Sequence, residues 1–309
     1  MTIVDAHHHV WDLSVRDQPW LAQPELAPLR RNYALSDLEP EAAAQGVTAT
    51  VLVQTVTEAE ETPEMLALAA ASDLVVGVVG WVDLEAPGAA EAIGALRQRP
   101  GGDLLVGIRH PVLIEPDPDW LARPAVLRGL AAVAAAGLVF DVVSEPRHLP
   151  AAVAAAAATP QLTFVLDHLG NPDLSAGVDE SWANPFRGLA ALPNTVAKLS
   201  GILSEPASCP VNRAAPVNRA APAQRAGPAE GAGGVQTAHM QPFYELALAG
   251  FGPGRLMFGS DWPVSTLTAR YADVCAAARS LTAGLSRAEK DAVFRDTAQR
   301  AYRLTLPPP

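Results

Sequence analysis

Ile-Val-Asp-Ala-His-His-His-Val-Trp-Asp, at residues 3–12, is the stretch from which the fold and the first candidate site residues follow. Its apolar start predicts a β-strand that runs into three histidines. Because side chains alternate between the two faces of a strand, we expect His7 and His9 to point one way and His8 the other. Two such imidazoles can bind a divalent metal or donate hydrogen bonds to an oxyanion, although an isolated pair is more often a core feature bonded to backbone. The rest of the chain decides between these interpretations.

Strand-like and helix-like segments alternate after this first strand. Further strands are expected at residues 47–56, 74–82, 104–112, 138–143, 163–166, 195–199 and 255–259. Helices are expected at residues 36–46, 60–71, 88–98, 124–136, 148–158, 182–192, 240–249, 268–281 and 286–303. Apolar strands that each precede a helix predict an α/β fold, a closed (β/α)8 TIM barrel formed by residues 1–309 as a single domain. A doubly wound open sheet competes with it, but no strand is followed by a Gly-x-Gly-x-x-Gly turn.

Residues 206–234 differ in composition from the rest of the chain. The hexapeptide Pro-Val-Asn-Arg-Ala-Ala occurs at 210–215 and again at 216–221, and Pro, Ala and Gly are abundant in the remainder. A repeat of this kind has no apolar face to bury, so it predicts a disordered insertion after the seventh strand. The insertion lies on the side of the barrel that carries active sites. A lid is one interpretation, and a tolerated expansion is the favoured one.

Charge and composition exclude several classes of partner. The 309 residues carry a formal net charge of −11, with no concentrated basic stretch for nucleic acid or an anionic membrane. Cys209 and Cys275 are far apart and form no Cys-x-x-Cys pair, so neither a disulfide framework nor a thiolate metal site is indicated. The sequence shows no secretion signal and no apolar run long enough to span a membrane. We therefore expect a cytoplasmic protein with a small polar substrate, and a homodimer stays open.

Two later strands also end in polar residues. The sixth runs into His168 before a Gly-Asn-Pro turn, and the eighth runs into Asp261 before Trp-Pro. In a closed barrel the eighth strand adjoins the first, which places Asp261 beside His7 and His9, and the sixth strand lies two strands away. We therefore expect these four residues to form one catalytic constellation at the carboxyl end of the barrel. The alternative for Asp261 alone is the N-cap of a following helix.

A second group of residues lies near the ends of other strands. Arg109 offers a multidentate cation for the hydroxyls or carboxylate of a polar substrate, and His110 either joins it or fills the barrel mouth. Lys198 on the seventh strand is expected either to face inward and stabilise an oxyanion or to extend to solvent. The candidate substrate-binding residues are Arg109, His110, Lys198, Gln54 and Trp262.

Four segments carry a resemblance to a known family. They are Asp-Ala-His-His-His-Val-Trp-Asp at 5–12, Val-Leu-Asp-His-Leu-Gly-Asn-Pro at 165–172, Lys-Leu-Ser-Gly at 198–201 and Leu-Met-Phe-Gly-Ser-Asp-Trp-Pro-Val at 256–264. With these segments the chain resembles the amidohydrolase superfamily, in the branch that contains sugar-lactone and dicarboxylate lactonases. The resemblance covers the chain apart from the repeat insertion. It implies a (β/α)8 barrel in which His7 and His9 are the strand-one pair, His168 is the strand-six histidine and Asp261 activates water.

The resemblance also bears on metal binding. Members with two metal ions carry a bridging lysine or glutamate on the fourth strand and a histidine on the fifth, whereas this chain has Gly-Ile-Arg-His at 107–110 and Phe-Asp-Val-Val-Ser-Glu at 140–145. We therefore expect one divalent ion or none, because similar lactonases include metal-independent enzymes. The ligands implied for a single ion, with zinc the favoured metal, are His7, His9 and Asp261, with His168 as a further candidate.

The expected reaction is the hydrolysis of a sugar-acid lactone, a cyclic ester. Asp261 would remove a proton from water during attack on the carbonyl and later protonate the departing alkoxide. His7, His9 and His168 would polarise the carbonyl, with or without a metal. One alternative is a metal-dependent decarboxylase of an aromatic or unsaturated acid, which predicts tightly bound zinc and release of carbon dioxide. Another is a catalytically silent barrel that only binds its ligand.

Overall fold

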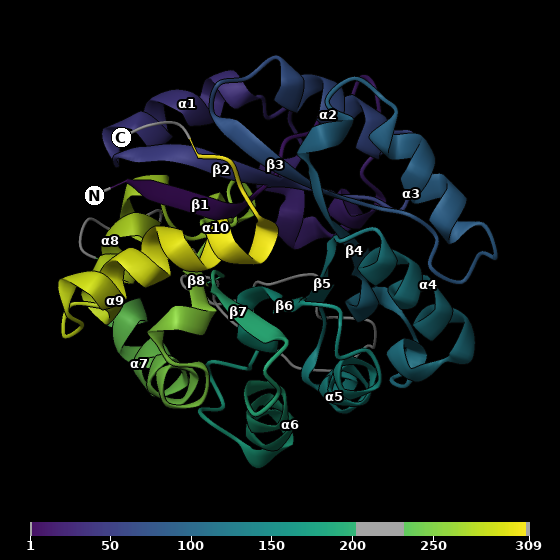
Figure 1. Cartoon of the computed structure of the whole chain (residues 1–309). Helices are drawn as coiled ribbons and strands as arrows, with labels where there is room; N and C mark the ends of the chain where they lie inside the picture. Colours follow the sequence, from purple (N-terminus) through teal and green to yellow (C-terminus); the bar gives the residue numbers. More distant parts are fainter. Residues whose placement is uncertain (1, 202–231, 307–309) are drawn as a thin grey trace.

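A parallel barrel forms the centre of the molecule (Figure 1). The computed structural model describes residues 2–201 and 232–306. Within them, eight strands follow one another in sequence order, and each pairs in parallel with the next. The strands are β1 (Ile3–His8), β2 (Val47–Val53), β3 (Val75–Gly80), β4 (Leu105–Pro111), β5 (Val139–Val143), β6 (Phe164–Leu166), β7 (Thr195–Leu199) and β8 (Leu256–Phe258). The (β/α)8 fold predicted from the alternation is confirmed.

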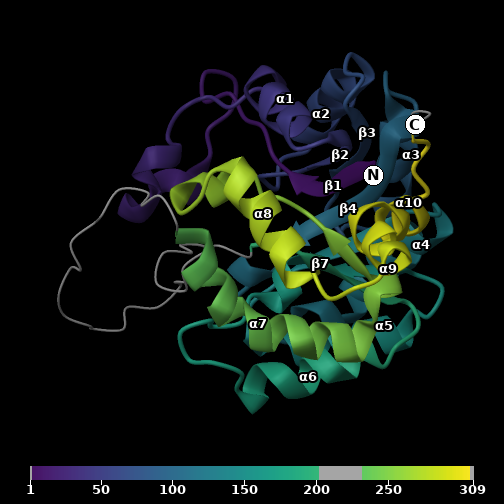
Figure 2. The same ribbon diagram turned by 90° about the vertical axis from the view of Figure 1, so that its left-hand side faces the viewer.

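A helix follows each strand and packs outside the barrel. The helices are α1 (Leu35–Ala44), α2 (Glu61–Ala70), α3 (Ala89–Arg97), α4 (Pro124–Ala135), α5 (Leu149–Ala158), α6 (Glu180–Ala190), α7 (Ala232–Phe251), α8 (Tyr271–Leu281), α9 (Arg287–Asp291) and α10 (Thr297–Tyr302). Figure 2 shows α1 and α2 along one side of the barrel and α6 and α7 along the opposite side. The final helix expected at 286–303 is divided into α9 and α10 by a π-helical turn at Ala292–Asp296.

Hydrogen bonds between the end of β1 and the segment after β8 close the barrel. Asp261 N donates to His7 O at 2.8 Å, and His9 N donates to Trp262 O at 2.7 Å. The approach is close because Gly259 follows β8, where a Cβ would lie only 2.8 Å from the Cβ of His7. A larger residue would push the two strand ends apart, so this glycine allows Asp261 to reach the histidines of β1.

Two apolar layers hold the barrel together. The outer layer packs the strands against the helices and includes the buried rings of Trp182 and Phe140. The inner layer consists mainly of strand valines such as Val4 and Val139, near the amino ends of their strands, and Tyr302 of α10 packs against it. The amino end of the barrel is therefore filled with apolar side chains, and the polar side chains that point inward gather toward the carboxyl end.

Part of the sequence interpretation falls outside the described residues. Cys209 and residues 206–231 of the expected insertion belong to that part, so their structure is not described. Residues 232–234 are already helical, because α7 begins at Ala232, earlier than the expected start at residue 240. Cys275 is buried as a free thiol. Across 2–201 and 232–306, no helix is both long enough and apolar enough to cross a membrane.

Candidate active site

A cavity of about 900 Å³ opens at the carboxyl end of the barrel. His9, His168 and Asp261 line it, together with loop residues such as Trp20 from the long segment between β1 and α1. The loops that follow parallel barrel strands gather at this end, which is where ligands of such barrels bind. The cavity is therefore the candidate active site.

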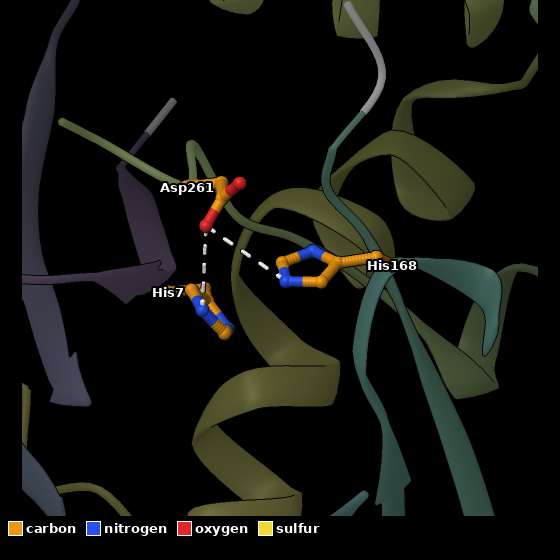
Figure 3. Close-up of side chains that lie close together, drawn as sticks. All are labelled: His7, His168 and Asp261. Atoms are coloured by element: carbon orange, nitrogen blue, oxygen red, sulfur yellow. Dashed lines mark ion pairs between the residues drawn. The ribbon is translucent and has the colours of Figure 1, made fainter. Parts of the chain in front are cut away.

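Asp261 Oδ1 lies among three imidazoles. It is 3.6 Å from His7 Nε2, 3.7 Å from His9 Nε2 and 3.8 Å from His168 Nε2. Figure 3 shows the Asp261 carboxylate facing His7 and His168. The Nε2 atoms of His7 and His9 are 3.1 Å apart. His8 points to the other side of β1, where its Nε2 lies 2.9 Å from Thr50 Oγ1.

The backbone conformation is unusual at His168, after β6, and at Asp261, after β8. The φ angle is 54° at His168 and 58° at Asp261, in the left-handed region that non-glycine residues rarely adopt. Such conformations persist where the surroundings hold a functional side chain in place. The Asp261 side chain does not cap the next helix, because the 3₁₀ turn Val264–Leu267 has Pro263 at its N-cap position. The alternative that Asp261 is a helix N-cap is therefore wrong.

The second nitrogen of each ring has a defined partner. His9 Nδ1 lies 2.7 Å from Val53 O, so Nδ1 carries the proton and Nε2 is an acceptor. His168 Nδ1 lies 2.7 Å from Ser200 Oγ. His7 is different, because its Nδ1 lies 3.1 Å from the ammonium nitrogen of Lys198.

Burial determines the protonation of the cluster. It lowers the pKa of His9 to about 3, and it also lowers the pKa of His7 and of His168, so the three rings are neutral near neutral pH. Burial raises the pKa of Asp261 above its ordinary value of 3.8. A carboxylate with a raised pKa is a stronger base than an exposed one, which suits it to accept a proton from water.

Arg109 and Gln54 both line the cavity. Arg109 Nη1 donates to Asp167 Oδ2 at 3.1 Å and lies 3.3 Å from His7 Nε2. Arg109 Nη2 donates to the backbone oxygen of Gln54 and lies 3.3 Å from the side-chain oxygen of the same residue. The guanidinium therefore places a fixed positive charge next to the histidine cluster.

Lys198, Asp141 and Asp167 form what we call the buried charge layer, next to His7. Lys198 Nζ lies 2.5 Å from Asp141 Oδ2 and 2.9 Å from Asp167 Oδ1. Tyr302 of α10 donates to Asp141 Oδ2 at 2.7 Å. Although burial opposes it, the positive charges of Lys198 and Arg109 hold the pKa of Asp167 well below its usual range. None of the three layer residues is among the described residues that line the cavity.

Asp5 is a further buried carboxylate, and it joins β1 to the segment after β8. Its Oδ1 accepts hydrogen bonds from His7 N at 3.2 Å and from Ser260 N at 2.8 Å, and Tyr271 donates to its Oδ2 at 3.0 Å. Burial raises the pKa of Asp5 to about 6. Because Ser260 precedes Asp261, this carboxylate fixes the position of Asp261 relative to His7.

Three residues expected to bind substrate lie away from the cavity wall. His110 stacks on Trp120, with ring centroids 4.2 Å apart. Trp262 packs edge-on against Tyr33 at 5.5 Å. Lys198 faces inward, which is one of the two orientations expected from the sequence, but it belongs to the buried charge layer.

The sequence interpretation did not single out Asp5 or Asp141. Their signal is a carboxylate inside an apolar strand, in Ile-Val-Asp-Ala at 3–6 and Val-Phe-Asp-Val-Val at 139–143. Burying a charge is unfavourable unless it is paired or hydrogen-bonded, so a carboxylate in a buried strand indicates partners elsewhere in the chain.

The donor set fits one divalent cation. His7, His168 and Asp261 offer ligand atoms that all lie within 4.8 Å of one another. His9 is not part of that trio, although its Nε2 lies close to both His7 and Asp261. Imidazole nitrogens and carboxylate oxygens are common ligands of zinc, and the hydrogen bond from His9 Nδ1 to a backbone carbonyl is typical of a ligating histidine. The lysine behind His7 departs from that pattern.

A family model and several known proteins match this chain. Residues 4–304 match the family model described as Amidohydrolase. The chain is 35% identical over 270 residues to an L-fucono-1,5-lactonase of Burkholderia ambifaria, covering 87% of this chain and 83% of that protein. It is also 35% identical over 311 residues to an L-fucono-1,5-lactonase of Burkholderia multivorans, covering 98% of this chain and 97% of that protein. A crystal structure of an amidohydrolase from Burkholderia multivorans with bound zinc matches with a TM-score of 0.83 and 32% identity, covering 99% of this chain and 100% of that one. The resemblance seen in the sequence is confirmed, and the chain belongs to the amidohydrolase family.

Proposed function

We propose that this protein hydrolyses a sugar-acid lactone and that Asp261 is the base that activates water. The observation that carries the proposal is the position of Asp261 on the cavity wall, with its Oδ1 3.6–3.8 Å from three neutral imidazoles. The lactonase names of two relatives at 35% identity support the substrate class.

Asp261 serves the reaction twice. Its carboxylate takes a proton from water as the water oxygen bonds to the lactone carbonyl carbon. The tetrahedral intermediate then collapses, the ring C–O bond breaks, and the carboxyl group returns the proton to the departing alkoxide. The product is the open-chain hydroxy acid, and no covalent bond to the protein is formed. Arg109 and the neighbouring histidines supply positive charge and N–H groups near the developing oxyanion.

A metal would use the same residues. His7, His9, His168 and Asp261 are the side chains that would hold a single divalent ion, and zinc is the proposed metal because a similar structure contains it. When bound, the ion would polarise the lactone carbonyl and the attacking water.

Charges around the cavity favour an uncharged polyhydroxy lactone over a dicarboxylate. Within the described part of the chain, the arginines and lysines that line the cavity are Arg109 and Arg147. Arg147 is already held by Glu145 at 2.6 Å and by two backbone carbonyls, so it is not free to bind a substrate carboxylate. Glu58 lines the same space, and its carboxylate can accept hydrogen bonds from sugar hydroxyls.

A substrate panel tests the proposal. Purified protein would be assayed with sugar-acid lactones of both ring sizes, with acid release followed by a pH indicator, after chelation and again with added zinc. We expect turnover of at least one sugar lactone, and loss of that turnover in Asp261→Asn. The matched control is Asp173→Asn, because Asp173 lines the same cavity but bonds to its own loop at Ser175.

The same panel, extended by simple esters and by aromatic and unsaturated acids, separates the alternatives. Zinc-dependent release of carbon dioxide from an aromatic or unsaturated acid, without lactone turnover, would replace lactonase by decarboxylase. A folded protein that turns over no lactone, ester or acid of the panel would support a barrel that only binds its ligand.

A further inference from the structure

Lys198 contacts a histidine that is itself a candidate metal ligand. Its Nζ makes hydrogen bonds with His7 Nδ1 at 3.1 Å and Asp141 Oδ2 at 2.5 Å, and an ion pair with Asp167 Oδ1 at 2.9 Å. All four side chains are completely buried. The ammonium group therefore makes hydrogen bonds with His7 and Asp141 and pairs with the charge of Asp167, and no contact with solvent competes for these partners.

The lysine contact determines which nitrogen of His7 carries the ring proton. An ammonium group can only donate, so His7 Nδ1 accepts from Lys198. Asp167 Oδ1, the other neighbour of that nitrogen, is 3.4 Å away and forms no hydrogen bond. A neutral imidazole has a single N–H, which is then on Nε2, 3.1 Å from His9 Nε2. His9 accepts at this atom because its own N–H is directed to Val53 O.

These hydrogen bonds run in one direction, from Lys198 through His7 to His9 and on to a backbone carbonyl. In this arrangement the Nε2 atoms of both histidines have partners without a metal. A metal at His7 Nε2 needs the lone pair of that nitrogen, so the ring proton would have to move to Nδ1. There it would face the ammonium group, and two donors would meet where a hydrogen bond now exists.

Arg109 adds to the same effect. Its Nη1 lies 3.3 Å from His7 Nε2, and the same nitrogen already donates to Asp167 Oδ2. This contact is longer than the 3.1 Å between His7 Nε2 and His9 Nε2, and the guanidinium also donates to Asp167 and Gln54, so His9 is the nearer partner of His7 Nε2. The guanidinium charge repels a divalent ion at close range. A lysine and an arginine of the chain therefore flank His7, one at each ring nitrogen.

We propose that Lys198 is a positioning residue that keeps His7 as a hydrogen-bond donor and thereby weakens the binding of a divalent metal at the cavity. This role differs from the direct oxyanion contact considered from the sequence, because Lys198 acts through His7. The inference rests on the proposed site, and on the lactone reaction only in that both use His7.

Zinc affinity of a paired variant tests the proposal. Lys198→Met combined with Asp141→Asn removes one positive and one negative charge, so the net charge of the layer is kept and no carboxylate loses its only cation. Zinc binding would be measured by competition with a chromophoric chelator, and the bound metal by elemental analysis. We expect the affinity for zinc to rise by about tenfold or more, the order of effect known for groups that support metal ligands.

Asp141→Asn alone is the matched control. It keeps the lysine at His7, so its zinc affinity should equal that of the wild type or fall below it. The proposal would be overturned by an unchanged or reduced affinity in the paired variant, or by an equal rise in both variants. Thermal unfolding curves would establish that each variant is folded.

Wild-type protein provides a second test that needs no folded variant. In the metal-free protein, nuclear magnetic resonance of isotope-labelled histidine nitrogens distinguishes a nitrogen with a proton from one with a lone pair, with His7 assigned by its absence in His7→Gln. We expect the lone pair on Nδ1 and the proton on Nε2. The reverse assignment would contradict the proposal. Neither test measures turnover, so the outcome is separate from whether the protein hydrolyses lactones.

Discussion

Two polar regions lie next to each other inside the barrel and differ in what they contact. His9, His168 and Asp261 line the cavity, so they can touch a substrate. Lys198, Asp141 and Asp167 are fully buried, and the lysine forms ion pairs with both carboxylates. His7 connects the regions, with Nε2 toward Asp261 and Nδ1 toward Lys198.

The residues of the cavity wall and the buried residues therefore have different roles. Residues of the cavity wall act on the substrate, whereas the buried residues determine where the cavity residues lie and which atoms carry protons. Substitutions at the wall should therefore change turnover with little change in stability. Substitutions beneath it should change both, because they leave buried groups without partners.

The largest effect is expected at Asp261. Asp261→Asn should lower kcat on the best lactone by about 10²–10⁴-fold, because an amide cannot accept the proton of water. Its free energy of unfolding should stay near that of the wild type, since the amide has the same shape and the backbone bond to His7 remains. Steady-state kinetics and urea denaturation measure the two quantities. Near-normal turnover would remove Asp261 from the role of base.

The next largest effect is expected at Asp5, which contacts no cavity atom but aligns Asp261. Asp5→Ala should lower the free energy of unfolding by at least about 2 kcal/mol, because the buried N–H groups of His7 and Ser260 lose their acceptor. It should also lower kcat, because the segment that carries Asp261 is no longer tied to β1.

Tyr271→Phe is the control for this prediction. It removes one donor to Asp5 Oδ2 and leaves both backbone contacts in place, so it should cost only about 1 kcal/mol and keep kcat. An Asp5→Ala protein that is as stable and active as the wild type would contradict the aligning role. Equal losses in kcat for the two variants would show that the backbone contacts are not the important ones.

The sequence predicted the cavity wall better than the buried residues, and the reason is physical. His9, His168 and Asp261 follow apolar strands, and the closure of a parallel barrel brings such strand ends together whatever the details of packing. Lys198 offered no comparable signal, because a long flexible side chain reaches solvent or an internal carboxylate equally well until its partners are known.

His110 and Trp262 were predicted to bind the substrate, but the local backbone geometry turns both side chains away from the cavity wall. His110 follows Arg109 directly, and strand alternation turns neighbours to opposite faces, so only one of them can reach the cavity. Trp262 follows Asp261, whose left-handed backbone directs the chain away from the cavity and leaves the indole against Tyr33. Strand alternation follows from the sequence, whereas the turn of the backbone at Asp261 is visible only in the structure.

A further effect, on stability alone, is expected from the charge of Asp5 as the pH changes. Burial raises its pKa from 3.8 to about 6, so the folded state favours the protonated acid more than the unfolded state does. The resulting stabilisation is complete below pH 3.8 and is lost as the pH rises to about 6. Asp5→Asn has no such charge, so between these values its stability should rise relative to the wild type by about 2–3 kcal/mol. Urea denaturation at several pH values measures the difference, and a relative stability that is constant or falls with rising pH would contradict the raised pKa.

The smallest effect is expected at His110, which follows the cavity-lining residue Arg109 but does not itself line the cavity. His110→Phe keeps the stacking on Trp120 but loses the hydrogen bond from Nε2 to Glu115 and the one that Trp81 donates to Nδ1, so stability should fall by about 1–2 kcal/mol. KM should not change, because the ring is not part of the cavity wall. Gln54→Leu is the contrasting variant, since Gln54 lines the cavity and should raise KM when its polar group is lost. A rise in KM for His110→Phe equal to that for Gln54→Leu would place His110 in contact with the substrate, and the boundary between the two regions would then have to include it.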